Sequence, residues 1–271
     1  MGDVIFDNRR FSDFGVIVSG ENTWAQPTRR VTKAQVPGKN GDLIVEAGEF
    51  NNVEISYPAG IMHDFDSDEL GGWETFSNFL LSRSDAYYRL EDEYHPLYYR
   101  MARFVPGIAP KVGTLNRSGQ FNVTFDCKPQ KWLKSGEDEI VLTDYTDGYG
   151  VAFTNPTEYD AFPEIQLTPK VMVEVLSDSY DSSVTIEFTP SDPTKYEAHP
   201  GKVIYYSEIS EAVWTYEVDG FEQVEYVTDQ VAVSGAVKIH PGANSLCVFE
   251  TFSGEIRDDI DIHLKPRWYT I

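Results

Sequence analysis

GQFNVTFDCKP, residues 119–129, alternates apolar and polar side chains more regularly than any other stretch of the 271-residue chain. Successive side chains of a β-strand point to opposite faces of its sheet, so this alternation predicts a strand with one buried face. The predicted inward side chains are those of Phe121, Val123, Phe125 and Cys127. The stretch therefore indicates that the first half of the chain is built on a half-buried β-sheet.

Just before this strand, residues 89–100, RLEDEYHPLYYR, place three consecutive acids between two arginines. Glu91, Asp92 and Glu93 could act as general acid and base or ligate a hard cation. Catalytic carboxylates must converge on one reacting atom, whereas neighbouring residues of a strand point to opposite faces. We therefore favour a β-hairpin over a catalytic site, with one strand at 87–91, a turn at 92–96 and a second strand at 97–104.

Three other segments of the first half carry structural signals. Residues 4–18 predict a pair of short strands joined by a turn, and residues 53–57 alternate as a half-buried strand does. Between residues 67 and 84 the apolar period becomes that of a helix, which predicts about three helical turns. The apolar side chains of this helix are Leu70, Trp73, Phe76, Phe79 and Leu80. An aromatic stripe of this kind is far more often core than a cofactor site, so we predict that it is part of the core.

A tight loop is predicted at residues 37–43, PGKNGDL. Pro37-Gly38 and Asn40-Gly41 are adjacent turn signals, because proline fixes φ while glycine and asparagine tolerate a positive φ. The loop is not a phosphate-binding P-loop, since it lacks the long glycine spacing and the Lys-Ser/Thr pair of that motif. We expect this loop to be exposed.

Composition divides the chain into two unlike halves. A chain of 271 residues exceeds the size of one comfortable core, which predicts two domains. Residues 1–134 carry 15 Lys and Arg against 18 Asp and Glu, a net −3, whereas residues 135–271 carry 7 against 26, a net −19. So acidic a second half should repel nucleic acid and anionic membranes, and the sequence has no basic patch interleaved with aromatic residues.

The second half has the pattern of an all-β domain. Residues 138–150 are acidic and then rich in Asp and Gly, which predicts a linker. Beyond Phe162, nine short strand-like segments are separated by turn residues without a helical period, which predicts a β-sandwich. Val213, Trp214 and Tyr216 could form a sugar-stacking platform, but an alternating strand also supplies tryptophan to its own core. We favour the core for these rings.

The sequence carries no motif of catalysis or metal binding. Cys127 and Cys247 both lie in apolar runs, which predicts buried free thiols rather than a disulfide or a nucleophile. The five histidines lie outside metal-ligand spacing of one another, and no G-x-S-x-G motif occurs. The first residues have no signal-peptide pattern and no apolar run approaches the length of a membrane helix, so we expect a soluble, non-secreted protein.

Several motifs of the first half, taken in order, resemble the N-terminal domain of the Dit family, the distal tail proteins of siphophages that infect Gram-positive bacteria. These motifs are FSDFGV (11–16), VPGKNGDL (36–43), NNVEISYP (51–58), YYRLEDEYHPLYYR (87–100) and GQFNVTFDCKPQKWLKSGE (119–137). In the second half, NPTEYDAFPEI (155–165) and IHLKPRWYTI (262–271) are similar to the beginning and the terminal strand of the family's second domain.

The resemblance implies a mainly β chain: a β-sandwich-like, ring-forming domain with one helix at 1–137, a linker at 138–157 and a galectin-like β-sandwich at 158–271. It implies a structural protein rather than an enzyme, without cofactor or metal, that forms a hexameric ring as the baseplate hub at the distal end of the tail tube. The implied partners are the other subunits of the homo-hexamer, the major tail tube protein, the tail-associated lysin or tail fibre protein, and receptor-binding or baseplate proteins. The implied location is the virion, at the phage tail tip, after assembly in the cytoplasm of the host bacterium.

Under this hypothesis the exposed loop and the acidic hairpin turn are the predicted contact sites with other subunits or the tube. The predicted residues are Pro37, Gly38, Lys39, Asn40, Gly41, Asp42, Glu91, Asp92, Glu93, Tyr94, His95 and Tyr98. The alternative function is a carbohydrate-binding module for host-surface adhesion, carried by the second domain. A glycosidase or peptidase ranks below both.

Overall fold

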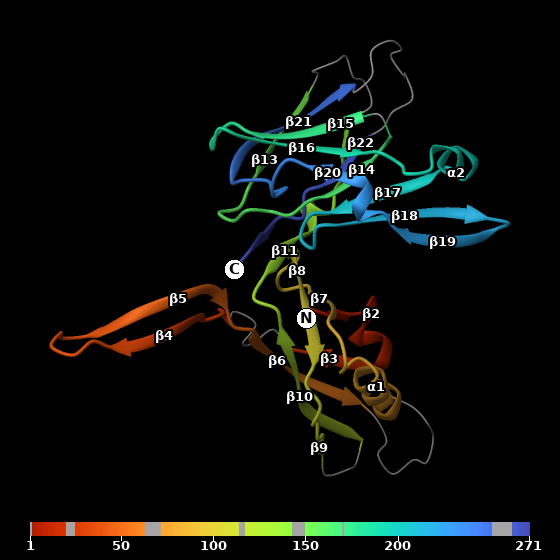
Figure 1. The fold of residues 1–271 in the computed structure, drawn as a ribbon. Coiled ribbons are helices and arrows are strands. Elements are labelled where there is room, and N and C mark those ends of the chain that lie inside the picture. Colours follow the sequence, from red (N-terminus) through yellow and green to blue (C-terminus); the bar gives the residue numbers. More distant parts are fainter. Residues whose placement is uncertain are drawn as a thin grey trace. The chain divides into compact units, whose positions relative to one another are not determined.

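The computed structural model describes residues 2–19, 25–62, 72–113, 117–142, 150–169, 171–250 and 262–271. Over these residues the chain is mainly β, with two short α-helices (Figure 1), which confirms the predicted fold class. The chain divides into two compact units, Met1–Trp132 with Ile271, and Leu133–Thr270.

The first unit is built on one large antiparallel sheet. Its strands run in the order β2-β1-β7-β8-β10-β6-β3, with β9 paired to β10 and β11 paired to β8. A separate two-stranded sheet consists of β4 and β5. The strand bounds are β1 (Val4–Phe6), β2 (Arg9–Arg10), β3 (Val16–Val18), β4 (Arg29–Gln35), β5 (Asp42–Phe50), β6 (Val53–Met62), β7 (Tyr88–Asp92), β8 (Tyr98–Phe104), β9 (Lys111–Val112), β10 (Ser118–Cys127) and β11 (Lys131–Leu133).

Strand β10 shows the alternation that the sequence predicts. It pairs with β6 over ten residues, from Ser118 opposite Met62 to Cys127 opposite Val53. Its inward side chains are buried, and they are Phe121, Val123, Phe125 and Cys127. The facing side chains of β6 are buried as well, and they are Val53, Ile55, Tyr57, Ala59 and Ile61. This long ladder therefore supplies much of the core of the first unit.

The predicted helix is present as α1 (Gly72–Leu81), and Phe76, Phe79 and Leu80 on it are buried. The ring of Phe76 meets that of Phe11 edge to face, with centroids 4.9 Å apart. Leu70 and the remainder of the predicted start, up to residue 71, lie outside the described residues. The aromatic stripe of α1 is therefore core, as predicted.

Residues 4–18 form three short strands rather than the single pair that the sequence predicts. β1 pairs with β2 and with β7, whereas β3 pairs with β6. The 3-10 helix η1 (Phe11–Phe14) separates them and ends at Gly15, whose φ of 73° belongs to the left-handed region that glycine favours. The buried rings of Phe11 and Phe14 fix this turn on the core.

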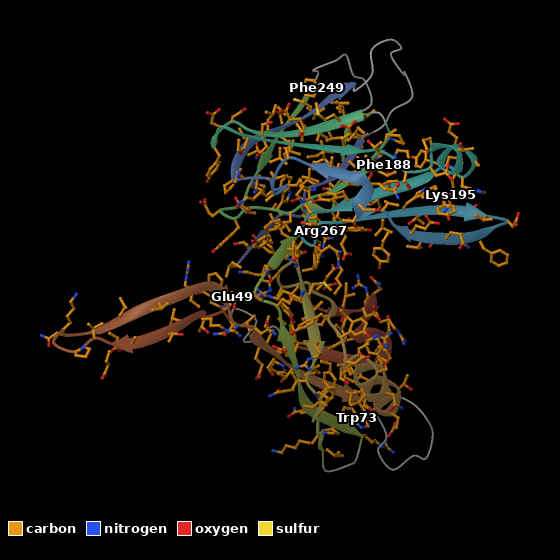
Figure 2. The ribbon with its side chains drawn as sticks, in the orientation of Figure 1. Glu49, Trp73, Phe188, Lys195, Phe249 and Arg267 are labelled. Carbon is orange, nitrogen blue, oxygen red and sulfur yellow. The ribbon has the colours of Figure 1, made fainter. Side chains whose placement is uncertain are left out.

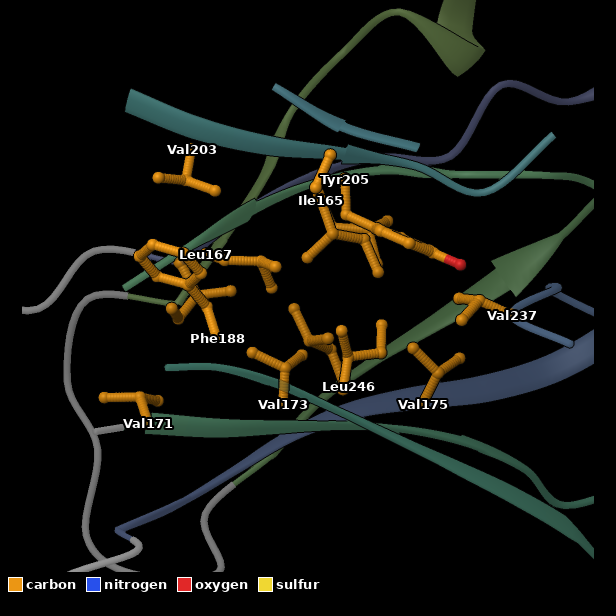
Figure 3. Packing of buried hydrophobic residues seen from close by; sticks show 14 of the residues in the cluster. Ile165, Leu167, Val171, Val173, Val175, Phe188, Val203, Tyr205, Val237 and Leu246 are labelled. Carbon is orange, nitrogen blue, oxygen red and sulfur yellow. The ribbon is translucent and has the colours of Figure 1, made fainter. Parts of the chain in front are cut away.

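The second unit consists of two antiparallel sheets whose buried side chains form one core (Figure 3). The strand order is β12-β22-β14-β17-β18-β19 in the six-stranded sheet and β13-β21-β15-β16-β20 in the five-stranded sheet. The bounds are β12 (Ile140–Leu142), β13 (Gly150–Asn155), β14 (Glu164–Leu167), β15 (Val171–Ser177), β16 (Ser182–Phe188), β17 (Gly201–Tyr206), β18 (Glu211–Val218), β19 (Phe221–Tyr226), β20 (Val231–Val233), β21 (Gly242–Glu250) and β22 (Ile262–Lys265). The remaining strand, β23 (Tyr269–Thr270), belongs to neither of these two sheets. The short 3-10 helices are η2 (Lys134–Gly136) and η3 (Thr228–Gln230).

Figure 3 shows side chains of both sheets meeting between the layers, among them Ile165 and Val203 from one sheet and Val173 and Leu246 from the other. This is the arrangement of a β-sandwich, in which the inner faces of two sheets share one core. The prediction of a β-sandwich in the second half is therefore confirmed. Trp214 is only 4% exposed and belongs to this core, so the core interpretation of that ring is also confirmed.

Two details of the second half differ from the sequence prediction. Residues 138–157 are more than a linker, because β12 pairs with β22 and β13 pairs with β21. The Asp- and Gly-rich composition that predicted the linker is concentrated at 143–149, which lie outside the described residues. A short helix, α2 (Pro193–Ala198), also interrupts the strands. Asp192 caps it by accepting a hydrogen bond from the backbone N–H of Lys195.

Candidate functional site

The predicted loop Pro37–Asp42 lies at the tip of the β4–β5 hairpin, and every one of its residues is exposed. The backbone N–H of Lys39 donates to the carbonyl oxygen of Val36 at 3.1 Å and closes a turn. Gly38 and Gly41 have φ of 81° and 88°, values that favour glycine. The turn chemistry read from PGKNGDL is therefore the chemistry that closes this hairpin.

The hairpin exposes apolar side chains on both faces. The ladder sets Thr32 opposite Val45 and Ala34 opposite Leu43, which places these four residues on one face. Leu43 is 54% exposed and Val45 is 51% exposed, while Ile44 on the other face is 56% exposed. An isolated two-stranded hairpin is at best marginally stable in water. The hairpin thus presents apolar surface that a partner can cover.

Polar contacts close the base of the hairpin. The side-chain amide of Asn51 donates to the Thr28 hydroxyl at 3.1 Å, and the Asn51 backbone N–H donates to the Thr28 carbonyl at 2.8 Å. Arg30 on β4 forms an ion pair with Glu49 on β5 at 3.0 Å, and Glu49 is labelled in Figure 2. These contacts tie the strands at their root and leave the tip free to meet another surface.

The second predicted site closes the β7–β8 hairpin, whose register sets Leu90 opposite Arg100. Asp92 is not available to a partner, because its side chain is only 10% exposed and already accepts hydrogen bonds within the unit. The Tyr57 hydroxyl donates to one Asp92 oxygen at 2.7 Å, and the His95 backbone N–H donates to the other at 2.7 Å. Burial, reinforced by the Asp92 charge, raises the pKa of Tyr57 well above its usual value.

The other acids of this turn also have partners within the unit. Arg89 forms an ion pair with Glu91 at 2.6 Å, so these two side chains share one face of β7. Arg10 forms an ion pair with Glu93 at 3.0 Å, where the Glu93 side chain is 48% exposed. Asp92 and Glu93 therefore connect the hairpin to other strands of its sheet, Glu91 forms an ion pair within β7, and Glu93 is the one that stays open to solvent.

Tyr94, His95 and Tyr98 are half-buried. The Tyr94 hydroxyl donates to the carbonyl oxygen of Val18 at 3.0 Å, and His95 Nδ1 lies 2.9 Å from Asp92. The two predicted segments belong to different sheets, since the loop closes β4–β5 and the acidic turn closes β7–β8. Of the two, only the loop is exposed throughout.

Sequence reasoning missed the most exposed apolar strands. Leu43, Ile44 and Val45 are three consecutive apolar residues directly after a turn, and such a run puts apolar side chains on both faces of a strand. In the second unit, β19 lies at one edge of its sheet and exposes Phe221 and Tyr226, each by 72%. The unbroken apolar run was the available signal for β5, whereas β19, FEQVEY, mixes apolar and polar residues and carries no such signal.

The described residues do not assemble a metal site, since no cluster of three or more His, Cys, Asp and Glu side chains occurs among them. Cys127 and Cys247 are buried free thiols, as predicted. Burial raises the pKa of Cys127 to about 12, so the nucleophilic thiolate is scarce at neutral pH. Within the same residues, no helix is long and apolar enough to cross a membrane.

The fold is shared with proteins of phage tails. The chain superposes on the Dit protein of SPP1, described as a paradigm of the hub adsorption apparatus in phages that infect Gram-positive bacteria, with a TM-score of 0.60. The identity is 12%, and the match covers 97% of each chain. A chain of the phage P2 baseplate, in its activated conformation with Ca, matches with a TM-score of 0.50 and 10% identity, over 93% of this chain and 99% of the other.

No protein-family model and no curated protein sequence matches the chain. The likeness to the SPP1 protein extends through both units, because almost the full length of each chain is superposed. The predicted resemblance to the Dit fold is therefore confirmed at the level of the fold.

Proposed function

We propose that this chain is a structural hub protein of a phage tail, which forms a hexameric ring at the distal end of the tail tube. The ring would join the tube to a tail-associated lysin or fibre protein and carry receptor-binding or baseplate proteins at its periphery. The observation that carries the proposal is the fold shared with the SPP1 Dit protein over 97% of both chains.

The exposed hairpin supports the ring. A head-to-tail interface that closes on itself uses two different surfaces of each subunit, one of which must reach the next copy. The β4–β5 hairpin has unpaired strand edges among the described residues and bears Leu43 and Val45 on one face. Burying that face on the next subunit would remove apolar surface from water, and a strand of that subunit laid along either edge would pair its backbone groups.

The charge distribution fits the same arrangement. Residues 1–134 carry a net charge of −3, so copies of the first unit can approach one another with little repulsion. Residues 135–271 carry −19 each, and six such domains repel one another unless they are separated and solvated. We therefore place the first units in the ring and the second units at its periphery, where a partner with a basic surface could bind them.

Coexpression with the tail tube protein of the same phage genome tests the hub role. The expected result is a stable complex on a sizing column that contains both proteins, and that still forms with a Phe221→Ser variant of the second unit. A ring that forms normally but never associates with tube, lysin or fibre proteins would contradict the hub role.

A second candidate function is carbohydrate binding by the second unit, favoured by the exposed rings of Phe221 and Tyr226 on β19. Exposed aromatic rings can stack on sugar faces, whereas the predicted platform residue Trp214 is buried. A glycan array probed with the full chain tests this function, because removing residues before 155 would also remove β12 and β13 from their sheets. Binding that is lost on Tyr226→Ala would favour the carbohydrate-binding function.

A further inference from the structure

A small cavity of about 190 Å³ lies beside the β7–β8 hairpin in the first unit. Its lining includes the side chains of Tyr57, Asp92, Tyr98, Tyr99, Arg100 and Lys131. These residues come from β6, β7, β8 and β11, which are neighbouring parts of one sheet. Strands of the sheet therefore supply most of the lining, and Ala25, Gln26 and His95, which lie outside the strands, complete it.

Arg100 brings a buried positive charge to this cavity. It is only 7% exposed, and its guanidinium makes one long hydrogen bond, from Nη1 to the carbonyl oxygen of Pro129 at 3.5 Å. Among the described residues it forms no ion pair. Burying a charge without a partner is costly, so a buried arginine usually faces a carboxylate, a phosphate or a network of acceptors. Toward the residues that the structure describes, Arg100 leaves most of its donor capacity unused.

Lys131 adds a second positive charge to the same lining. It is half-buried, and it too lacks an ion pair within the part of the chain that the structure describes. Burial lowers the pKa of Lys131, and the nearby charge of Arg100 lowers it further. Two like charges in one cavity repel each other, and an anion between them would relieve both the repulsion and the burial cost.

Asp92 does not supply that anion. Its two oxygens are occupied by the Tyr57 hydroxyl at 2.7 Å and by the His95 backbone N–H at 2.7 Å, and it forms no ion pair with Arg100 or Lys131. Asp92 offsets part of the positive charge through space. The lining nevertheless keeps two cations against one carboxylate, with tyrosine rings as its apolar walls.

We propose that this cavity binds a single carboxylate group, held by the guanidinium of Arg100 and the ammonium of Lys131. An arginine fork matches the two oxygens of a carboxylate, and a lysine adds a compact charge beside it. The cavity is smaller than the roughly 300–1,000 Å³ of typical small-molecule pockets, so its occupant is one acidic group with few further atoms. That group is either an acidic side chain of another protein chain or a free small carboxylic acid.

Titration of the full chain with sodium acetate tests the proposal. Binding is monitored by the NMR chemical shifts of the backbone amides and by the melting temperature, and sodium chloride at the same ionic strength is the reference. We expect acetate, and not chloride, to shift amides around Arg100 and Lys131 and to raise the melting temperature. The Lys131→Met variant should bind acetate about tenfold more weakly or worse, because a hydrogen bond to a charged group is lost. Lys128→Met, an exposed lysine three residues away, is the matched control and should bind as the wild type does.

Arg100→Met tests the buried charge separately. It keeps most of the side-chain volume and removes an unpaired charge, so without acetate it should melt no lower than the wild type and should no longer respond to acetate. If Arg100→Met fails to fold, Lys131→Met still decides the question. Equal acetate response in wild type, Lys131→Met and Lys128→Met, or no response in the wild type, would overturn the proposal.

Assembly measurements distinguish the two sources of the carboxylate. If acetate competes with self-association or with complex formation, and Lys131→Met weakens the same step, the bound group is an acidic side chain of a protein partner. If assembly is unchanged by both while acetate binds, the ligand is a free small acid. The proposal concerns a ligand site in the first unit and does not depend on the ring.

Discussion

The double substitution Leu43→Ser and Val45→Ser on β5 should weaken self-association while leaving the single chain folded. The two side chains share one face of the hairpin and are 54% and 51% exposed in the isolated chain. Full burial of a leucine or valine side chain contributes about 1.5–3 kcal/mol, so covering the exposed half of both contributes about 1.5–3 kcal/mol per interface. Since 1.4 kcal/mol is a tenfold change, we expect association about 10- to 100-fold weaker.

The assay is light scattering on a sizing column over a range of protein concentrations, together with urea unfolding of the single chain. The urea midpoint should stay near that of the wild type, because substitutions of exposed side chains usually change stability by less than about 0.5 kcal/mol. Val224→Ser on β19 is the matched control for Val45→Ser, since Val224 is 56% exposed but lies in the second unit. Association of the double variant at the same concentrations as the wild type would refute the role of this hairpin face.

Three further predictions concern the first unit. Tyr57→Phe should lower the free energy of unfolding by about 1.5–3 kcal/mol, the range for a hydrogen bond to a charged group. The pKa of Tyr57 is raised in the folded state, so the stability that its protonated hydroxyl contributes is complete below about pH 10 and is lost as the pH rises further. When the urea midpoint is plotted against pH, Tyr57→Phe should therefore fall less steeply at alkaline pH than the wild type. An equal fall in both proteins would argue against the buried Tyr57–Asp92 bond. Asp92→Ala should lower the free energy of unfolding by about 1–3 kcal/mol, because the Tyr57 hydroxyl is left without its acceptor. Glu93→Ala removes an exposed ion pair and should have little effect in the same urea assay. Equal losses of stability in the two variants would contradict the difference in burial. A thiol reagent at neutral pH should leave Cys127 unmodified in the folded chain and modify it in urea, because burial raises its pKa to about 12; rapid labelling of the native protein would show that the thiol is accessible.

Local patterns predicted those elements whose burial follows from the sequence itself. The alternation of residues 119–129 predicted β10 and its inward face, because a half-buried strand needs that period wherever it lies. The same reasoning predicted the core position of Trp214 in β18 and the apolar face of α1. In each case the face that the sequence pattern predicts to be buried is the face that packs against the neighbouring elements.

Features that depend on distant partners were not predictable in this way. RLEDEYHPLYYR shows the acids of the β7–β8 turn, but not that Asp92 is buried under the Tyr57 hydroxyl, which comes from β6. Arg100 ends the same motif, and its burial beside Lys131, with no ion pair among the described residues, depends on how β8 and β11 pair. The helix α2 had a local signal in Asp192-Pro193, a cap followed by proline, which the surrounding strand pattern obscured.

The boundary between the two units shows a further limit of composition. An Asp- and Gly-rich stretch predicts a turn as readily as a linker, and here it separates two strands that enter different sheets of the second unit. Charge counts separate two halves with net charges of −3 and −19, but they do not mark where one domain ends.

The mass of the particle in solution tests the ring most directly. Light scattering on a sizing column should find a particle near six times the 30.7 kDa mass of one chain, or, with the tail tube protein present, a heavier complex that contains six chains and the tube protein. A mass of one chain at every concentration, with the tube protein present as well as absent, would contradict the proposed ring.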